Sequence, residues 1–148
     1  LGYINYEFSS FAKPGYECKN NVTYWNRGKY IGFGPSAHSF DGVKRKWNIS
    51  NNQKYIEKIK LNSIAYESEI LSETDILNEI IMIGLRTSEG LDLDLIKSKF
   101  SNLNLEKLTQ QIQLKIMDGV LVKTDNKLHP SRDYKFLTDG IASDLFIT

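Results

Sequence analysis

The sequence predicts an α+β fold in which a short β-rich region precedes a helical C-terminal region. Residues 1–45 are rich in β-forming residues but lack the apolar content of a complete sheet. A helical spacing of apolar residues begins at Ser72, and the elements expected from there follow the order helix, helix, helix, hairpin, helix. This order is typical of a winged-helix-like domain. We therefore expect an incomplete domain over 1–45, a connecting helix and linker over 46–71, and a winged-helix-like C-terminal domain over 72–148.

The first segment predicts two short strands, one over about Asn5–Ser9 and one in "KYIGFG" at 29–34. A turn at Lys13-Pro14-Gly15 lies between them, because Pro fixes φ and Gly accepts a positive φ. "NNVTYW" at 20–25 reads as a loop. Two strands cannot bury both of their faces alone, so we expect them to belong to a larger sheet of which most is missing here.

The connecting segment predicts a polar, basic loop, then a helix, then an extended stretch. The loop is "DGVKRKWNIS" at 41–50, and Asn51 or Asn52 can cap the helix that follows. Tyr55, Ile56 and Ile59 give this helix an apolar stripe. Residues 61–71 are expected to be extended.

The first helix of the C-terminal segment begins at a capping pair, Ser72 and Asp75. Its apolar residues have helical spacing, and Gly84 is expected to let a neighbouring helix approach closely. They are Ile76, Leu77, Ile80, Ile81 and Ile83. Asp92 or Asp94 is expected to cap a short second helix.

The third helix is expected in "NLEKLTQQIQLKIMDG", from Asn104 to Gly119 at its C′ position. Asp125-Asn126 is expected to turn a hairpin, and a last helix follows. The predicted inward residues of the third helix are Leu105, Leu108, Ile112, Ile116 and Met117. Those of the last helix are Phe136, Leu137, Ile141, Leu145 and Phe146.

Composition and charge exclude several classes of protein. The chain is 41% hydrophobic and 25% charged, as in soluble globular proteins, and has one cysteine, Cys18, so no internal disulfide forms. Residues 72–148 carry nine Lys and Arg against twelve Asp and Glu, a net charge of −3. A DNA-binding winged helix needs the opposite sign. We therefore expect a cytoplasmic protein with no nucleic-acid partner, and contact with a membrane only through partner proteins.

Three stretches, in order along the chain, resemble one family. "YEFSSFAKPGYECKNNVTYW" is similar to Y-E-I-S-N-F-A-[RK]-P-G followed by H-N-x-x-Y-W, and "YIGFGPSAHSF" to Y-L-G-x-G-x-x-A-H-S. "LNEIIMIGLRTSEGLDL" is similar to L-R-x-x-x-G-[VL]-[DN]-L. These blocks resemble the oxygen-independent coproporphyrinogen III oxidase-like family of radical S-adenosylmethionine (SAM) proteins, most closely its heme chaperone branch, HemW.

The resemblance implies a (β/α) barrel that holds a [4Fe–4S] cluster through C-x-x-x-C-x-x-C and cleaves SAM. That motif is absent from this chain, in which Cys18 stands alone and three thiolates are needed. Residues 1–45 would then be the last strands of a truncated radical SAM barrel. The chain by itself is predicted to be inactive, with no catalytic residue and no metal ligand assigned to it.

The resemblance also implies cofactor-binding residues. Tyr24 and Trp25 would supply flat contacts to a porphyrin, and His38 would point toward the SAM and porphyrin cavity. Gly32 and Gly34 would let the backbone lie close to its neighbours at the end of a barrel strand. Ordinary packing is the alternative for the aromatic residues, and a structural role is the alternative for His38.

The chain departs from the family pattern at one informative position. Asn20 stands where the heme chaperone branch has a His implicated in heme binding, and Asn is a poor iron ligand compared with imidazole. Cys18 could coordinate iron as a thiolate or be a small buried hydrophobic residue.

The parent protein is therefore expected to handle porphyrin or heme, as a heme chaperone. The alternatives are an oxygen-independent coproporphyrinogen III oxidase, which decarboxylates two propionates, and a structural docking module. Propionates need basic partners. The candidates are Arg27, Lys29 and Lys44-Arg45-Lys46, which a solvated basic loop would equally explain.

Overall fold

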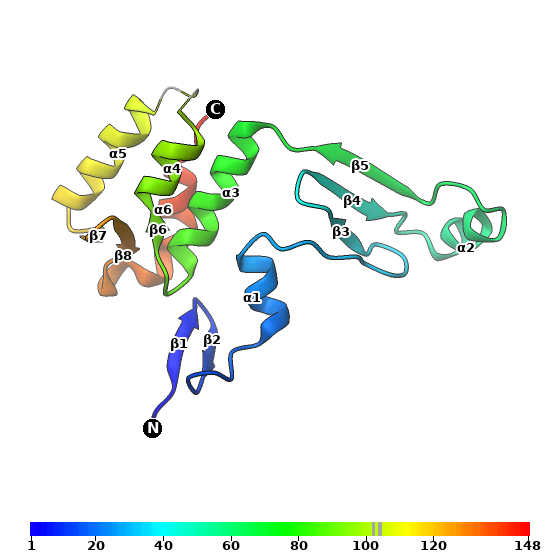
Figure 1. Ribbon diagram of the computed structural model, residues 1–148, viewed down its shortest axis with the longest axis horizontal. Coiled ribbons are helices and arrows are strands. Elements are labelled where there is room, and N and C mark those ends of the chain that lie inside the picture. The colour runs from blue at the N-terminus through cyan, green and yellow to red at the C-terminus, as the bar shows by residue number, and fades with distance from the viewer. Residues whose placement is uncertain (102, 104) are drawn as a thin grey trace. The chain divides into compact units, whose positions relative to one another are not determined.

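The computed structural model describes residues 1–101, 103 and 105–148, and it divides into two compact units (Figure 1). Unit 1 joins Leu1–Cys18 to Ser72–Thr148, and unit 2 is Lys19–Leu71. Helices and strands occur in both units, so the α+β class is confirmed. The boundaries predicted from the sequence, at 1–45, 46–71 and 72–148, concern the domains of a longer protein and stay predictions.

Unit 1 begins with a hairpin, β1 (Ile4–Glu7) and β2 (Ser10–Ala12). The strand predicted over about Asn5–Ser9 is present as β1, but it ends at Glu7 because residues 8–9 form the turn. The Glu7 carboxylate closes this turn by accepting from the amide of Ser9 at 3.1 Å and from its hydroxyl at 3.0 Å. The predicted turn after the hairpin is confirmed, since the Tyr16 amide donates to the Lys13 carbonyl at 2.9 Å.

The rest of unit 1 confirms the predicted order of helices and hairpin. Its helices are α3 (Glu73–Arg86), α4 (Leu93–Lys99), α5 (Glu106–Met117), the 3₁₀ helix η1 (Arg132–Leu137) and α6 (Thr138–Asp144). The strands are β6 (Leu91–Asp92), β7 (Leu121–Thr124) and β8 (Lys127–Pro130), in the antiparallel order β6-β8-β7. Strand β6 was not predicted from the sequence. The predicted start of α5 at Asn104 lies outside the described residues.

The core of unit 1 lies between α3, the other helices and the small sheet. Gly84 of α3 permits the predicted close approach, but its neighbour is strand β6: a Cβ there would lie 2.7 Å from the Cα of Leu91. The buried hydrophobic residues of this core are Leu77, Ile81, Leu85, Leu91, Ile96, Phe100, Leu108, Ile112, Leu121, Leu128, Ile141, Ala142 and Leu145.

Three of the residues predicted to face inward are exposed. Met117 at the end of α5 is 81% exposed, and Phe136 and Leu137 are 90% and 59% exposed. Phe136 and Leu137 lie in η1, whose period of three residues per turn breaks the spacing of the helix that follows. The ring of Phe136 packs edge-on against Phe8 in the β1–β2 turn, with centroids 6.3 Å apart.

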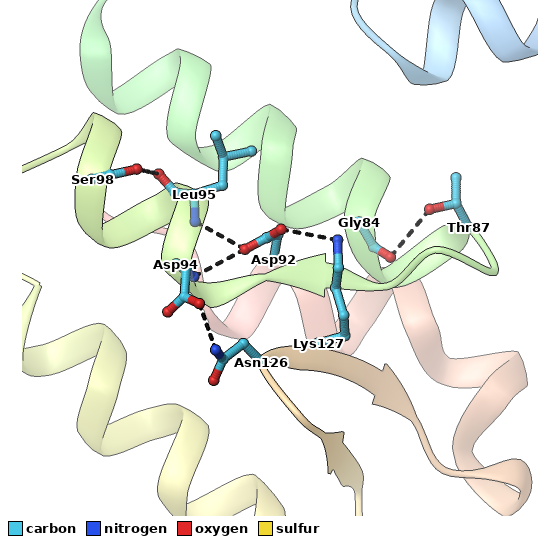
Figure 2. Close-up of polar contacts among 8 residues, drawn as sticks. All are labelled: Gly84, Thr87, Asp92, Asp94, Leu95, Ser98, Asn126 and Lys127. Carbon is cyan, nitrogen blue, oxygen red and sulfur yellow. Dashed lines mark hydrogen bonds and ion pairs between the residues drawn. The ribbon is translucent and has the colours of Figure 1, made fainter.

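Polar contacts join the start of α4 to the tip of the β7–β8 hairpin (Figure 2). The Asp92 carboxylate accepts from the amides of Asp94 at 3.0 Å and Leu95 at 2.9 Å, and pairs with the Lys127 ammonium at 3.0 Å. Asn126 donates its side-chain amide to Asp94. Asp92 is therefore the cap of α4 and also an anchor of the hairpin.

Unit 2 contains an antiparallel sheet in the order β3-β4-β5, formed by β3 (His38–Phe40), β4 (Lys44–Asn48) and β5 (Tyr66–Ile70). Its helices are α1 (Lys19–Trp25) and α2 (Asn52–Lys60). The cap of α2 is Asn51, whose side chain accepts from the Lys54 amide at 3.0 Å, as predicted. The extended stretch within 61–71 is confirmed as β5.

Three predictions for unit 2 are wrong. "NNVTYW" forms most of helix α1, which buries no residue and so has no apolar stripe to reveal it. "KYIGFG" is not a strand, since only Tyr30 bridges Phe40. Residues 44–48 are strand β4 and not a loop, because they pair along their whole length with β5.

Candidate functional site

One face of the unit 2 sheet carries a row of four side chains. Phe40 of β3 lies opposite Arg45 of β4, which lies opposite Glu69 of β5. Tyr30 bridges Phe40 from the other side. Directly opposed residues of antiparallel strands share a face, so these aromatic and charged side chains lie side by side.

A second row lies on the same face, two residues along each strand. It consists of His38, Trp47 and Glu67. The rings of His38 and Trp47 are tilted by 33° with centroids 6.4 Å apart, and the Trp47 indole donates to Glu67 at 3.1 Å. His38 is exposed, so its imidazole is accessible to a ligand.

Helix α1 and the turn after it add two more side chains. The ring of Tyr24 meets that of Tyr30 edge-on, with centroids 4.6 Å apart. The guanidinium carbon of Arg27 lies 5.2 Å from the centre of the Phe40 ring, a cation–π contact. The term "sheet face" is used below for the two rows together with Tyr24 and Arg27.

The basic stretch Lys44-Arg45-Lys46 is not one cluster. Strand alternation places Arg45 on the sheet face and Lys44 and Lys46 on the opposite face. Lys46 lies there over the ring of Tyr66, 5.2 Å from its centre. Burial lowers the pKa of Arg27, and the charge of Arg45 lowers it further.

The other residues predicted from the sequence all lie in unit 2. Gly32 is tightly constrained: its amide donates to the Ser39 hydroxyl at 3.0 Å, and a Cβ would lie 2.1 Å from the His38 carbonyl oxygen. Gly34 has open space but a φ of +93°. Trp25 is half-buried, whereas Tyr24 is 43% exposed. The binding roles of these residues stay predictions.

Asn20 lies in the first turn of α1 and is exposed. It stands four residues before Tyr24, so the two side chains share one side of the helix. A ligand that contacts Tyr24 therefore passes near position 20.

The residues of this chain do not fit a [4Fe–4S] cluster. Cys18 is the one cysteine, and it is exposed, so its interpretation as a buried hydrophobic residue is wrong. Within the described part of the chain, no three His, Cys, Asp or Glu residues gather as a metal site. No chemical step of a cluster can be assigned to these residues.

Unit 1 has a cavity of about 220 Å³ between the β1–β2 hairpin and the C-terminal elements. Glu7, Arg86, His129 and Lys135 are among the residues that line it. Burial would raise the pKa of Glu7, but hydrogen bonds from Ser10 and Ser9 and the charge of Arg86 outweigh it and hold that pKa below its ordinary value.

The sequence analysis missed Tyr30, Phe40 and Trp47 as parts of the site. They lie in three separate stretches, and only the pairing of β3 with β4 brings them together. The alternation of "KRKWN" over 44–48 is the signal that could have indicated a strand with Arg45 and Trp47 on one face.

Comparison with known proteins identifies relatives over most of the chain. Residues 71–133 match the HemN C-terminal domain family. The heme chaperone HemW of Bacillus subtilis is 36% identical over 101 residues, which are 67% of this chain and 26% of that protein. HemW of Lactococcus lactis is 31% identical over 120 residues, 78% of this chain and 31% of that protein. The chain thus spans about a third or less of these relatives.

A solved structure of coproporphyrinogen III oxidase (HemN) from Escherichia coli, described as a radical SAM enzyme, has the same fold. It matches with a TM-score of 0.75 and 17% identity, over 98% of this chain and 37% of that one. Among the described residues, no helix is long and apolar enough to cross a membrane.

Proposed function

We propose, because this chain is the C-terminal part of a HemN/HemW-like radical SAM protein, that its parent carries heme as a HemW-like heme chaperone. The sheet face is the part of this chain that contacts the porphyrin. The observation that carries the proposal is the exposed His38 imidazole beside Trp47, on the face that also holds Tyr24, Tyr30 and Phe40.

The residues of the sheet face suit heme as a cargo. Imidazole is a common ligand of heme iron, and His38 presents an exposed imidazole on the sheet face. Aromatic rings contact a flat macrocycle with large apolar area and few lost rotamers. Tyr24 is exposed and stands one helical turn after Asn20, the position at which the heme chaperone branch has a His.

Two observations favour a heme chaperone over a coproporphyrinogen III oxidase. The relatives at 31–36% identity are named heme chaperones. The oxidase structure is only 17% identical, and it supports the fold alone.

The remainder of the parent would supply the barrel, the [4Fe–4S] cluster and SAM. Residues 1–45 would be its last strands, and residues 72–148 a winged-helix-like domain with β7 and β8 as the wing. We place the protein in the cytoplasm, with porphyrin or heme and its own barrel as partners and no nucleic acid. The net charge of −3 over residues 72–148 supports the last point.

Heme titration followed by absorbance tests the proposal. The chain has two histidines, and His129 in β8 of unit 1 is the matched control. His38→Ala should abolish the Soret shift of imidazole ligation, and His129→Ala should keep it. Loss of the shift in His129→Ala alone, or no binding by the wild type, would refute the proposal.

Two variants of α1 separate ligation from packing. Asn20→His should raise heme affinity and strengthen the low-spin Soret shift, because it adds a metal–ligand bond next to Tyr24. Trp25→Ala should weaken binding without changing the ligation state. If Asn20→His leaves both affinity and spectrum unaltered, helix α1 does not contact the porphyrin.

A further inference from the structure

We propose that Arg27 and Arg45 form a pair that binds the carboxylates at the edge of the porphyrin. This inference rests on the proposed function. It places the carboxylate-bearing edge of the porphyrin at the end of the sheet face that holds Arg27 and Arg45. The geometry that carries it is the position of both residues beside one buried ring, since the Arg27 guanidinium lies over the Phe40 ring and Arg45 lies opposite Phe40 in the sheet.

Both arginines are fixed relative to Phe40. Arg45 lies opposite Phe40 in the β3–β4 register, at a typical Cβ separation of about 5 Å. The Arg27 guanidinium lies over the Phe40 ring, 5.2 Å from its centre. Phe40 is only 6% exposed, so its ring is held in the sheet beneath the Arg27 guanidinium.

The two like charges favour an anion between them. Burial lowers the pKa of Arg27, and the charge of Arg45 lowers it further, since the two cationic groups repel one another. Arg45 pairs with Glu69 at 3.5 Å, and the two side chains are 34% and 47% exposed. Exposed pairs of this kind contribute little stability, so a ligand carboxylate can replace Glu69.

The distance along the strand matches the ligand. His38 and Phe40 lie two residues apart on β3, or about 7 Å along the strand. An iron bound at His38 therefore leaves the edge of the macrocycle near the arginines. Arginine binds carboxylates through two parallel hydrogen bonds, so the pair selects flat ligands with acidic groups on one edge.

The backbone at Arg27 supports a role for its side chain. Arg27 has a φ of 53°, in the left-handed region where glycine is favoured. A large side chain at such a position is uncommon. Retaining an arginine there is costly for the fold, and binding an anion is a reason for it.

The test compares ligands with and without carboxylates. Heme, metal-free protoporphyrin and the dimethyl ester of heme are titrated into the wild-type chain, Arg27→Gly, Arg45→Gln and Lys46→Gln. Glycine suits the backbone at position 27, so that variant should fold. Lys46→Gln is the matched control, because it removes the same charge from the same strand on the opposite face.

Arg27→Gly and Arg45→Gln should each weaken the binding of heme and of metal-free protoporphyrin about tenfold, with the Soret maximum of bound heme unchanged. Lys46→Gln should bind like the wild type, and the ester should bind weakly to all four proteins. Equal binding of heme and its ester by the wild type, or equal effects of Arg45→Gln and Lys46→Gln, would overturn the inference while the proposed function stands. Absence of any porphyrin binding by the wild type would overturn both.

Discussion

Unit 1 encloses its own hydrophobic core, whereas unit 2 leaves most of its large apolar side chains on its surface. Leu77, Ile81 and Leu91 in unit 1 have no exposed surface. The structure describes every residue of unit 2. The buried hydrophobic residues there are Phe40, Ala65 and Leu71. Burial of apolar surface therefore stabilises unit 1, whereas much of the apolar surface of unit 2 stays exposed.

Helices α3 and α2 show the same contrast. Both have a side-chain cap at their start, Ser72 and Asn51, and both have apolar residues at helical spacing. The stripe of α3 is covered, and four of its residues are buried. On α2 no residue is buried, with Ile56 and Ile59 about half exposed. The pattern of apolar residues thus identifies a helix but not what covers it.

The largest expected effect is Leu77→Ala in the core of unit 1. It should lower the free energy of unfolding by about 3–5 kcal/mol, because it leaves a cavity among buried side chains. Ile56→Ala on α2 is the control and should cost less than about 0.5 kcal/mol. Far-UV circular dichroism follows mainly unit 1, and tryptophan fluorescence follows unit 2, since Trp25 and Trp47 both lie there. Equal shifts of both signals for both variants would show that the units unfold as one.

Gly90→Ala should have the next largest effect. Gly90 has a φ of +76°, and a Cβ there would lie 2.4 Å from the His129 ring and 2.9 Å from the Leu128 carbonyl oxygen. We expect a loss of about 2–4 kcal/mol from the clash and the backbone together. Gly119→Ala shares the positive φ but has open space around it, and it should cost about 1–2 kcal/mol. Urea unfolding measures both, and equal losses would argue against the clash.

The same contrast explains which parts of the fold could be predicted from the sequence. In unit 1, a cap, an apolar stripe and a hairpin turn agree with one another at α3 and at Asp125-Asn126, and these predictions are confirmed. Of the residues there that were wrongly predicted to face inward, Phe136 and Leu137 lie in the 3₁₀ helix η1 that continues into α6, and Met117 is the last residue of α5. Caps, apolar stripes and turn residues predict an element correctly where the element packs on a hydrophobic core.

In unit 2, local signals were insufficient. The residues of strand β4 were predicted to form a basic loop. They form a strand because they pair with neighbouring strands, which their own composition does not indicate. For the candidate site, the sequence indicated Tyr24 and His38 through family resemblance. The pairing of Phe40 with Arg45 depends on strand register, which one short basic stretch does not specify.

Acid should weaken unit 1 through Glu7. The hydrogen bonds and the charge of Arg86 outweigh burial and hold the pKa of Glu7 below its ordinary value, so the folded state favours the ionised carboxylate. Its contribution to stability is complete above the unfolded pKa of about 4.3, and it is lost as the pH falls through the lower folded pKa. Glu7→Gln should therefore be less stable than the wild type near pH 7, with a difference that shrinks in acid. Urea midpoints from pH 2 to pH 7 measure this, with exposed Glu89→Gln as the control, and a difference independent of pH would contradict it.

The smallest expected effects compare the two helix caps. The Ser72 hydroxyl accepts from the Asp75 amide at 3.1 Å, and the Asp75 carboxylate accepts from the Ser72 amide at 2.9 Å. Because α3 packs on the core, Ser72→Ala should lower the free energy of global unfolding by about 1 kcal/mol. Asn51→Ala removes the corresponding bond of α2, but α2 is not covered, so the variant should fray that helix and cost only a few tenths of a kcal/mol globally. Urea unfolding measures the first change, and faster amide hydrogen exchange confined to α2 measures the second. An equal global loss for both variants would mean that α2 is covered in solution and that the contrast between the two units is smaller than the structure indicates.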